Sequence, residues 1–384
     1  MINKRFSYMI CLFISLIVLI VFLLLFNYNK NEKNIKGKIV VWADESSYEY
    51  LNSIAQGFMI SNSKCQINVE KINKDEYVSK VKEALELGKL PNILKLDNKK
   101  RDQLIKETEG GISLKDNKDF IDKYSNNFTS RMEQEVTIDN KVVGIPFTTS
   151  PIVLYLRQDI LATYGYTYEN INTWEDLITM GKDVYAKSEG KIKILNGIGK
   201  DYEYLVSLLI MQAMEETTDE DLIKKMVNEK LERLKNENIL NLDTNGGFLA
   251  RISSIEGMSE IEALSVECKW TSNNAPSKSY GGNRFYTAEG ENLLILNKES
   301  NSENLLVEKY IAALTTNTKN MQLYINDSNL FLSYLSAYKN KDIERQANHF
   351  EDKSPLVVMS NIMQKAPNLK DYEKYQSIKD QFVK

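Results

Sequence analysis

The chain has 384 residues, of which 42% are hydrophobic and 27% are charged, an ordinary composition for a globular protein. A chain of this length exceeds what one compact core usually supports, which favours two lobes or domains. The formal net charge of -4 argues against a protein that binds the nucleic-acid backbone, because such a protein needs a clear excess of lysine and arginine. We therefore expect no nucleic-acid partner.

The sequence offers little of the chemistry that enzymes use. Its only histidine, His349, lies in a polar stretch typical of a protein surface. It contains no HExxH, no Cys-x-x-Cys, no serine nucleophile elbow and no phosphate-binding loop. A glycosidase-type carboxylate pair is not excluded by counting, since the chain has 53 acidic residues. We expect a protein that is not an enzyme and that needs neither a metal nor a cofactor.

Three cysteines leave one question of pairing. Cys11 lies within an apolar N-terminal run and is separated from the rest. Cys65 and Cys268 form a disulfide only if the fold brings them together. Two separate buried thiols are the preferred interpretation.

An apolar run covers residues 8–26, with Ser15 as its one clearly polar position. At about 1.5 Å per residue, such a run nearly spans a hydrocarbon core of about 30 Å. Lys4 and Arg5 precede it, as in an export signal. No pattern of small residues for signal peptidase follows, which favours an uncleaved anchor over a cleaved signal. A lipoprotein needs a cysteine just after the run, whereas Cys11 lies near its start.

These features predict the order of segments along the chain. Residues 1–6 are expected in the cytoplasm, 7–27 as a transmembrane signal anchor and 28–36 as a linker. Lysines also flank the outer end of the run, but the short N-terminal side and the large following domain favour an N-in, C-out orientation. We therefore expect a single-pass protein of the cell membrane whose domain 37–384 lies outside the cytoplasm.

Strand and helix patterns alternate over the first part of this domain. Short apolar or alternating runs predict strands at 38–43, 66–71 and 92–96. Apolar residues at helical spacing predict helices at 47–62 and 75–87. This order favours a mainly parallel sheet covered by helices.

The second part of the chain shows further elements of both kinds. Strands are predicted at 141–145, 152–156 and 291–296, and helices from the N-cap Thr173, at 219–236 and at 303–314. The charged helix 219–236 is expected to turn four side chains inward, namely Leu222, Met226, Leu231 and Leu234. The C-terminal part reads as helices broken near Pro355 and Pro367.

Three segments in this order resemble the maltose-binding-protein type of extracellular solute-binding proteins, which serve ABC importers of sugars. The first is GKIVVWADESSYEYLNSIAQGF at 37–58, followed by LPNILKLDN at 90–98. The second is KVVGIPFTTSPIVLYLRQDIL at 141–161, with NTWEDL at 172–177. The third is SYGGNRFYTAEGENLLILNKES at 279–300. The short, acidic stretch 214–266 and the missing lipobox depart from the family pattern and weaken a transfer of sugar specificity.

The resemblance implies an α/β, periplasmic-binding-protein-like fold of two lobes joined by crossover hinge strands. One lobe would hold about 37–148 and 272–318, and the other about 149–271 and 319–384. The implied function is capture of a small polar ligand, a carbohydrate first of all, by hinge closure for the permease subunits of an ABC transporter. The alternative is a membrane-anchored sensing or adaptor protein that uses the same fold for signalling, which the uncleaved anchor and missing lipobox favour.

Candidate ligand contacts lie at strand ends, at the crossovers and in a glycine-rich loop. Carboxylates at strand ends accept hydrogen bonds from sugar hydroxyls, and aromatic faces stack on pyranose rings. Each candidate also has an ordinary structural interpretation, as a helix-terminal charge, a core side chain or a packed loop tip. The candidates are Trp42, Asp44, Glu45, Asp97, Phe147, Tyr155, Tyr202, Tyr204, Trp270, Tyr280, Arg284 and Tyr286.

Overall fold

The computed structural model describes residues 35–108, 110–327, 330–339, 341–344, 347–351 and 354–383. Within these ranges no helix is both long enough and apolar enough to cross a membrane. The predicted cytoplasmic segment, the predicted anchor at 7–27 and nearly all of the predicted linker lie outside the described residues.

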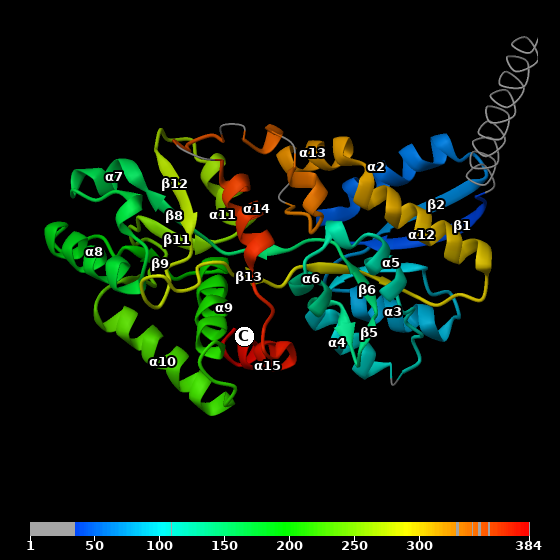
Figure 1. Cartoon of the computed structure of the whole chain (residues 1–384), viewed down its shortest axis with the longest axis horizontal. Helices are drawn as coiled ribbons and strands as arrows, with labels where there is room; N and C mark the ends of the chain where they lie inside the picture. The colour runs from blue at the N-terminus through cyan, green and yellow to red at the C-terminus, as the bar shows by residue number, and fades with distance from the viewer. Residues whose placement is uncertain are drawn as a thin grey trace, which may run out of the picture.

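The first lobe is built on a five-stranded sheet in the order β2-β1-β3-β14-β6. Its strands are β1 (Gly37–Ala43), β2 (Cys65–Lys71), β3 (Ile93–Asp97), β6 (Gly144–Pro146) and β14 (Glu291–Ile295). The first three strands run parallel, as their alternation with helices predicts, whereas β14 is antiparallel to both β3 and β6. The sheet is therefore mixed, because β14 enters it from the second lobe (Figure 1).

Helices cover both faces of this sheet. Helices α2 (Glu45–Ser61) and α12 (Asn301–Thr316) share one core with Ile39 and Val41 of β1. Helices α3 (Tyr77–Glu86) and α4 (Asn98–Glu107) share a smaller core with Leu94 and Leu96 of β3. The period-two pattern of the strands thus sends alternate side chains to different helix layers.

The second lobe has its own five-stranded sheet, in the order β10-β9-β11-β8-β12. The strands are β8 (Val153–Arg157), β9 (Leu195–Asn196), β10 (Leu240–Asn241), β11 (Ala250–Ser253) and β12 (Trp270–Asn274). Helices α8 (Trp174–Lys187), α9 (Lys200–Met214) and α10 (Glu220–Asn236) pack with it in a separate core.

One helix start in this lobe follows its sequence signal, and the buried face of another helix differs from its prediction. The predicted N-cap Thr173 accepts a hydrogen bond from the backbone N–H of Asp176 at 3.2 Å. The inward face of α10 differs from the prediction, because its buried residues are Ile223, Val227, Leu231 and Leu234. Leu222 is 43% exposed, so its predicted inward position is wrong. The buried face of α10 begins one position later, at Ile223, because Ile223 and Val227 are four residues apart and therefore lie on the same side of the helix.

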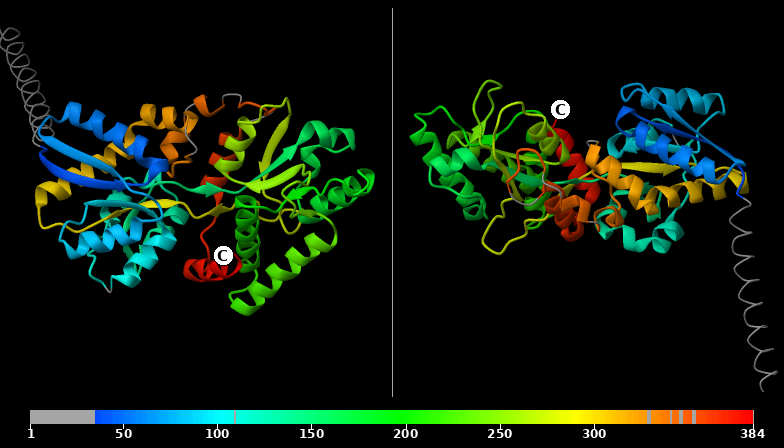
Figure 2. Two further views of the ribbon diagram at one scale, coloured as in Figure 1. Left: turned by 180° about the vertical axis from the view of Figure 1, so that it is seen from behind. Right: turned by 90° about the horizontal axis from the view of Figure 1, so that it is seen from above.

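Three segments lie side by side where the chain passes between the lobes. Strands β7 (Ser150–Pro151) and β13 (Thr287–Ala288) form a two-residue antiparallel ladder. The third segment contains Phe331. Its carbonyl oxygen accepts a hydrogen bond from the backbone N–H of Thr149, next to β7, at 3.0 Å. Just after β13, a Cβ on Gly290 would overlap the carbonyl oxygen of Thr148. The crossing is thus narrow and closely packed (Figure 2).

The C-terminal helices return to the junction of the lobes. Helix α14 (Pro355–Lys365) lies beside the crossing, and α15 (Tyr372–Phe382) packs on α9 between the two lobes (Figure 1). The sequence-based lobe boundaries stay a prediction. They place 319–384 in the second lobe, whereas Tyr324 stacks edge-on against Tyr50 of the first, with ring centroids 5.0 Å apart.

Cys65 and Cys268 are separate buried thiols, which confirms the preferred interpretation.

The remaining elements connect these layers. The other helices and strands are α5 (Lys118–Lys123), η1 (Ser125–Asn127), α6 (Ser130–Glu135), β4 (Thr137–Ile138), β5 (Lys141–Val142), α7 (Gln158–Thr163), η2 (Tyr168–Asn170), α11 (Ile255–Glu262), α13 (Thr318–Asp327), η3 (Leu335–Tyr338) and η4 (Lys341–Glu344).

Candidate functional site

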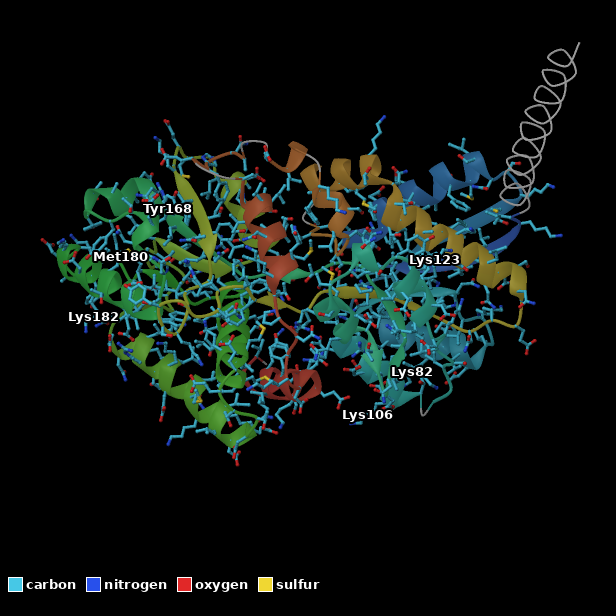
Figure 3. The ribbon with its side chains drawn as sticks, in the orientation of Figure 1. Lys82, Lys106, Lys123, Tyr168, Met180 and Lys182 are labelled. Atoms are coloured by element: carbon cyan, nitrogen blue, oxygen red, sulfur yellow. The ribbon has the colours of Figure 1, made fainter. Side chains whose placement is uncertain are left out.

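A cleft of about 900 Å³ lies between the two lobes. Its walls come from both lobes, its floor from the crossing segments and one side from α15. The first lobe contributes Ser46, Lys74, Asp97, Asn98, Lys99, Asp102, Gln103, Lys106 and Glu107; the second contributes Lys200, Glu203, Tyr204, Ile255 and Glu256; the crossing and α15 contribute Thr148, Thr149, Ser150, Glu289, Gly290, Glu291, Leu330, Phe331, Gln376, Lys379, Asp380 and Val383. Lys106 lies on the side of the first lobe that faces α15 (Figure 3).

Helix N-termini from both lobes meet at this cleft. Helices α2 and α4 begin there in the first lobe, and α9 and α11 begin there in the second, so their first residues line the cleft. The arrangement follows from the fold, because each of these helices follows a strand whose carboxyl end points to the cleft. Free N–H groups and the positive end of the helix dipole favour electron-rich oxygen atoms.

A buried ion cluster fixes the strand ends of the first lobe. The Lys95 side chain is 0% exposed, and its Nζ lies 2.9 and 2.8 Å from the two carboxylate oxygens of Asp44. The same Nζ also pairs with Glu291, which lines the cleft. Burial opposes ionisation of Asp44, but Lys95 and two serine hydroxyls hold its pKa below the ordinary value. Both oxygens of the Asp44 carboxylate therefore already have a hydrogen-bond donor, and Asp44 links the end of β1 to β3.

Carboxylates with free acceptor capacity face the cleft from both lobes. Asp97 caps α4 by accepting a hydrogen bond from the Lys100 backbone N–H at 2.8 Å and another from the Lys100 Nζ at 3.2 Å, and its side chain remains 27% exposed. Across the cleft, the hydroxyl of Tyr204 donates to Glu256 Oε2 at 2.9 Å. A carboxylate has about four lone-pair sites, so both groups retain positions for ligand donors.

Helix α15 closes one side of the cleft and is held to several elements. Glu289 accepts from Lys379 at 2.5 Å and from the Tyr375 hydroxyl at 2.7 Å. These partners hold the pKa of Glu289 below its ordinary value, although burial acts in the opposite direction. The Tyr372 hydroxyl accepts a hydrogen bond from Asn98 of the first lobe. Through these contacts α15 joins the two lobes beside the cleft.

Two of the predicted contact residues, Asp97 and Tyr204, line the cleft. Asp44 lies behind the surface in the ion cluster described above. Glu45 is exposed and does not line the cleft. Its Oε1 lies 3.6 Å from the Nζ of Lys71 on β2. The strand-end rule thus located this edge of the sheet but did not distinguish buried carboxylates from those exposed to the cleft.

Most of the predicted aromatic contacts are core side chains. The structure buries Trp42, Phe147, Tyr155 and Trp270 in the cores of the lobes and crossing, and Tyr202 packs half-buried against the second core. The first four lie in or beside strands, and strand aromatics are mostly covered by helices, whereas Tyr202 lies in the first turn of α9. None of these side chains lines the cleft in this conformation.

The glycine-rich loop also differs in position from its prediction. Arg284 donates to backbone oxygens of Ile171, Asn274 and Ala275, so it fastens the loop to the second lobe. Tyr280 is 77% exposed and donates to Asp176. Tyr286 is buried and lines a second cavity, outside the cleft.

Sequence reasoning missed the residues that give the cleft its chemistry. Glu256 lies in the first turn of α11, a helix that the sequence patterns above did not predict. Glu289 and Lys379 meet only through the return of the C-terminal helix, 90 positions along the chain. The aromatics that line the cleft, Tyr204 and Phe331, are only 7% and 1% exposed, so little aromatic surface faces the cleft. In the described part of the chain, no cluster of His, Cys, Asp and Glu fits a metal ion.

Comparison with known proteins agrees with this architecture. The sequence model of the bacterial extracellular solute-binding protein family matches residues 53–238, just under half of the chain. A lactose-binding protein of Rhizobium radiobacter is 23% identical over 168 residues, which are 42% of this chain and 39% of that protein. A probable ABC transporter-binding protein of Deinococcus radiodurans is 37% identical over 75 residues, 19% of this chain and 18% of that protein. The matches therefore span well under half the length of these relatives.

Solved structures share the fold across nearly the whole chain. The sugar-binding protein MalE from Xanthomonas citri has a TM-score of 0.72 at 13% identity, with 90% of each chain covered. A cyclic alpha-maltosyl-1,6-maltose binding protein from Arthrobacter globiformis has a TM-score of 0.70 at 14% identity, covering 90% of this chain and 93% of its own. The matched family is described as solute-binding, and the names of these two structures are those of sugar-binding proteins. In its matched segment and in its two-lobed fold, the chain resembles the bacterial extracellular solute-binding proteins of the maltose-binding-protein type.

Proposed function

We propose that this chain captures a small carbohydrate outside the cell and delivers it to an ABC importer. The observation that carries the proposal is the cleft, in which helix N-termini and carboxylates from both lobes face the same space. Hydroxyl groups of a sugar both donate and accept hydrogen bonds, so they match this mixture of N–H donors and carboxylate acceptors. Asp97, Tyr204 and Glu256 are the side chains that we expect to contact it.

Capture would proceed by closure of the lobes. A ligand that bonds to Asp97 on one wall and Glu256 on the other stabilises the conformation in which these walls approach each other. The narrow crossing can act as the hinge, because its two-residue ladder is independent of both large sheets. We propose that the permease subunits recognise the closed form.

A sugar panel tests the binding step. Full-length protein is heated with lactose, maltose and maltooligosaccharides, and binding of any sugar that raises the melting temperature is then measured by calorimetry. A ligand at 100 times its Kd stabilises the folded state by about 2.7 kcal/mol. If none of these sugars stabilises the protein, the carbohydrate assignment fails.

Two substitutions on one helix show whether the cleft is the site. Glu256→Gln keeps the side-chain shape but weakens the acceptor, which should reduce sugar affinity by roughly 1.5–3 kcal/mol. Glu260→Gln is the matched control, because Glu260 lies one turn further along α11, is 62% exposed on its side chain and does not line the cleft. Equal affinities for the two variants would place the sugar elsewhere.

The anchor prediction leads to a second experiment and to the alternative function. We propose that residues 7–27 hold the protein in the membrane with its binding domain outside. Full-length protein should then stay in the membrane fraction with an intact N-terminus, and a mature N-terminus within 28–36 would contradict this. Loss of labelled-sugar uptake in cells lacking the chain supports the importer role. Unchanged uptake together with sugar binding would favour a membrane-anchored sensor.

A further inference from the structure

A second cavity of about 390 Å³ lies between the lobes, and it shares no lining residue with the cleft. It is bounded by α9, by the chain around β13, by the connector between α14 and α15, and by one side chain from α6 of the first lobe. Its lining residues are Arg131, Met211, Met214, Glu215, Asn283, Phe285, Tyr286, Thr287, Lys365, Pro367, Asn368, Leu369 and Lys370. A volume of this size falls in the range of small-molecule sites.

The walls of this cavity are largely apolar. Met211 and Met214 come from the end of α9, Phe285 from the chain before β13, and Pro367 and Leu369 from the connector. Thioether and aromatic side chains adapt to irregular apolar ligands and contact aromatic rings favourably. A wholly polar solute would therefore leave these walls without suitable contacts.

Arg131 supplies a buried positive charge at the first-lobe side of the cavity. The residue is 2% exposed, and its guanidinium carbon lies 5.0 Å from the ring centroid of Tyr372. Its Nη2 donates a long hydrogen bond of 3.4 Å to the Thr287 carbonyl oxygen. Its Nη1 lies 3.2 Å from Glu135 Oε1 but makes no hydrogen bond within the described residues. A buried guanidinium with an unused donor is suited to an anionic acceptor.

Glu135, the partner of Arg131, is buried as well. Burial raises the pKa of Glu135 to about 7, even though Arg131 acts to lower it. Burial therefore disfavours the ionised form of the carboxylate that pairs with Arg131. The buried positive charge adds to the preference of this cavity for anions.

The rim of the cavity carries the same sign of charge. Lys365 lies over the ring of Phe285, with Nζ 5.0 Å from its centroid, and Lys370 donates to the Glu215 carbonyl oxygen at 2.8 Å. The Glu215 carboxylate is the one acidic group of the lining, and it already accepts from the Tyr286 hydroxyl at 2.7 Å and from Asn283 at 3.0 Å. The lining thus contains three basic groups, Arg131, Lys365 and Lys370, and one carboxylate that is already hydrogen-bonded.

We propose that this cavity binds a small carboxylate with an apolar tail, at a site separate from the sugar cleft. The carboxylate accepts hydrogen bonds from Arg131 and is attracted by the two rim lysines, while the tail contacts the methionines and Phe285. Such a ligand touches the first lobe through Arg131 and the second through α9, so it bridges the lobes. The inference does not depend on what the cleft binds.

The charge of the ligand is tested with phenylacetate and phenylacetamide, which share a shape but differ in charge. Binding to full-length protein is measured by calorimetry and by ligand-detected NMR. Phenylacetate should bind at least about tenfold more tightly, because a charge-assisted hydrogen bond is roughly twice as strong as a neutral one. Equal binding of both probes, or no binding of phenylacetate at millimolar concentrations, would overturn the proposal.

The place of binding is tested with lysine and arginine variants. Lys365→Gln and Lys370→Gln, at the exposed rim, should each weaken phenylacetate binding several-fold, and Arg131→Gln should abolish it. Lys106→Gln is the control, since Lys106 lines the sugar cleft instead. If Arg131→Gln fails to fold, the two rim variants still decide. A Lys106 effect equal to theirs would assign the probe to the cleft and refute the second site.

Discussion

Replacing Lys95 by methionine tests the buried ion cluster of the first lobe. The change removes the ammonium but keeps a long side chain, which leaves Asp44 and Glu291 without their shared partner. Side chains of Lys95 and Asp44 are 0% and 7% exposed, so water has little access to Asp44, whereas Glu291 is 18% exposed at the cleft. Breaking a buried pair by removing one partner costs about 3–5 kcal/mol. We expect Lys95→Met to lower the free energy of unfolding by that amount.

The matched control for this substitution is Lys71→Met on neighbouring β2. Lys71 lies 3.6 Å from Glu45, with 49% and 79% of their side chains exposed, so the loss should be about 0–1 kcal/mol. Urea unfolding of both variants, followed by circular dichroism, measures the difference. Equal losses for Lys95→Met and Lys71→Met would refute the reasoning.

The same comparison has a defined pH dependence. The folded-state pKa of Asp44 is lowered from its ordinary value of 3.8, so its ionised form contributes stability above that value. This contribution is lost as the pH falls through the lower folded-state pKa. The stability gap between wild type and Lys95→Met should therefore narrow on acidification, and a gap that widens would contradict the assigned ion pair.

Three further substitutions test other contacts. Because burial raises the pKa of Glu135 to about 7 from 4.5, wild type should lose stability as the pH rises between these values, and Glu135→Gln should remove that trend in thermal melts. Gln134 exchanges two hydrogen bonds with the backbone of Leu369, at 2.7 and 3.0 Å, so Gln134→Ala should speed amide exchange in α15 but not in the sheets. Tyr155→Phe removes the 2.8 Å hydrogen bond to Ser254 and should cost about 1–3 kcal/mol in urea unfolding while leaving sugar affinity unchanged.

Local pattern was enough to predict much of the fold. Period-two and period-3.6 spacing located β1, α2, β2, α3 and β3 to within a few residues, since each has one face in a core. Capping chemistry identified the start of α8 at Thr173. The phase of α10 was misjudged because Leu222 and Ile223 are adjacent apolar residues, and only packing against the second lobe distinguishes them.

The cleft was predicted less well because its chemistry depends on distant contacts. Asp44 and Asp97 both end strands, yet Asp44 is buried against a lysine 51 positions away, whereas Asp97 pairs with the nearby Lys100 and stays partly exposed. Trp270 and Tyr155 looked suitable for stacking, but neighbouring helices cover both. No short-range signal indicates that α15 returns beside Glu289. Such information lies in the tertiary arrangement rather than in spacing along the chain.

The close approach at Gly290 has a consequence for how tightly this protein can hold a ligand. Because even a methyl group there would overlap the Thr148 carbonyl oxygen, the size of this one residue sets the separation of two crossing segments. A wider separation would change the angle that the lobes adopt at rest, and with it the work needed to close them. Affinity could then be adjusted during evolution, or by design, at a position that need not exchange a single hydrogen bond with the ligand.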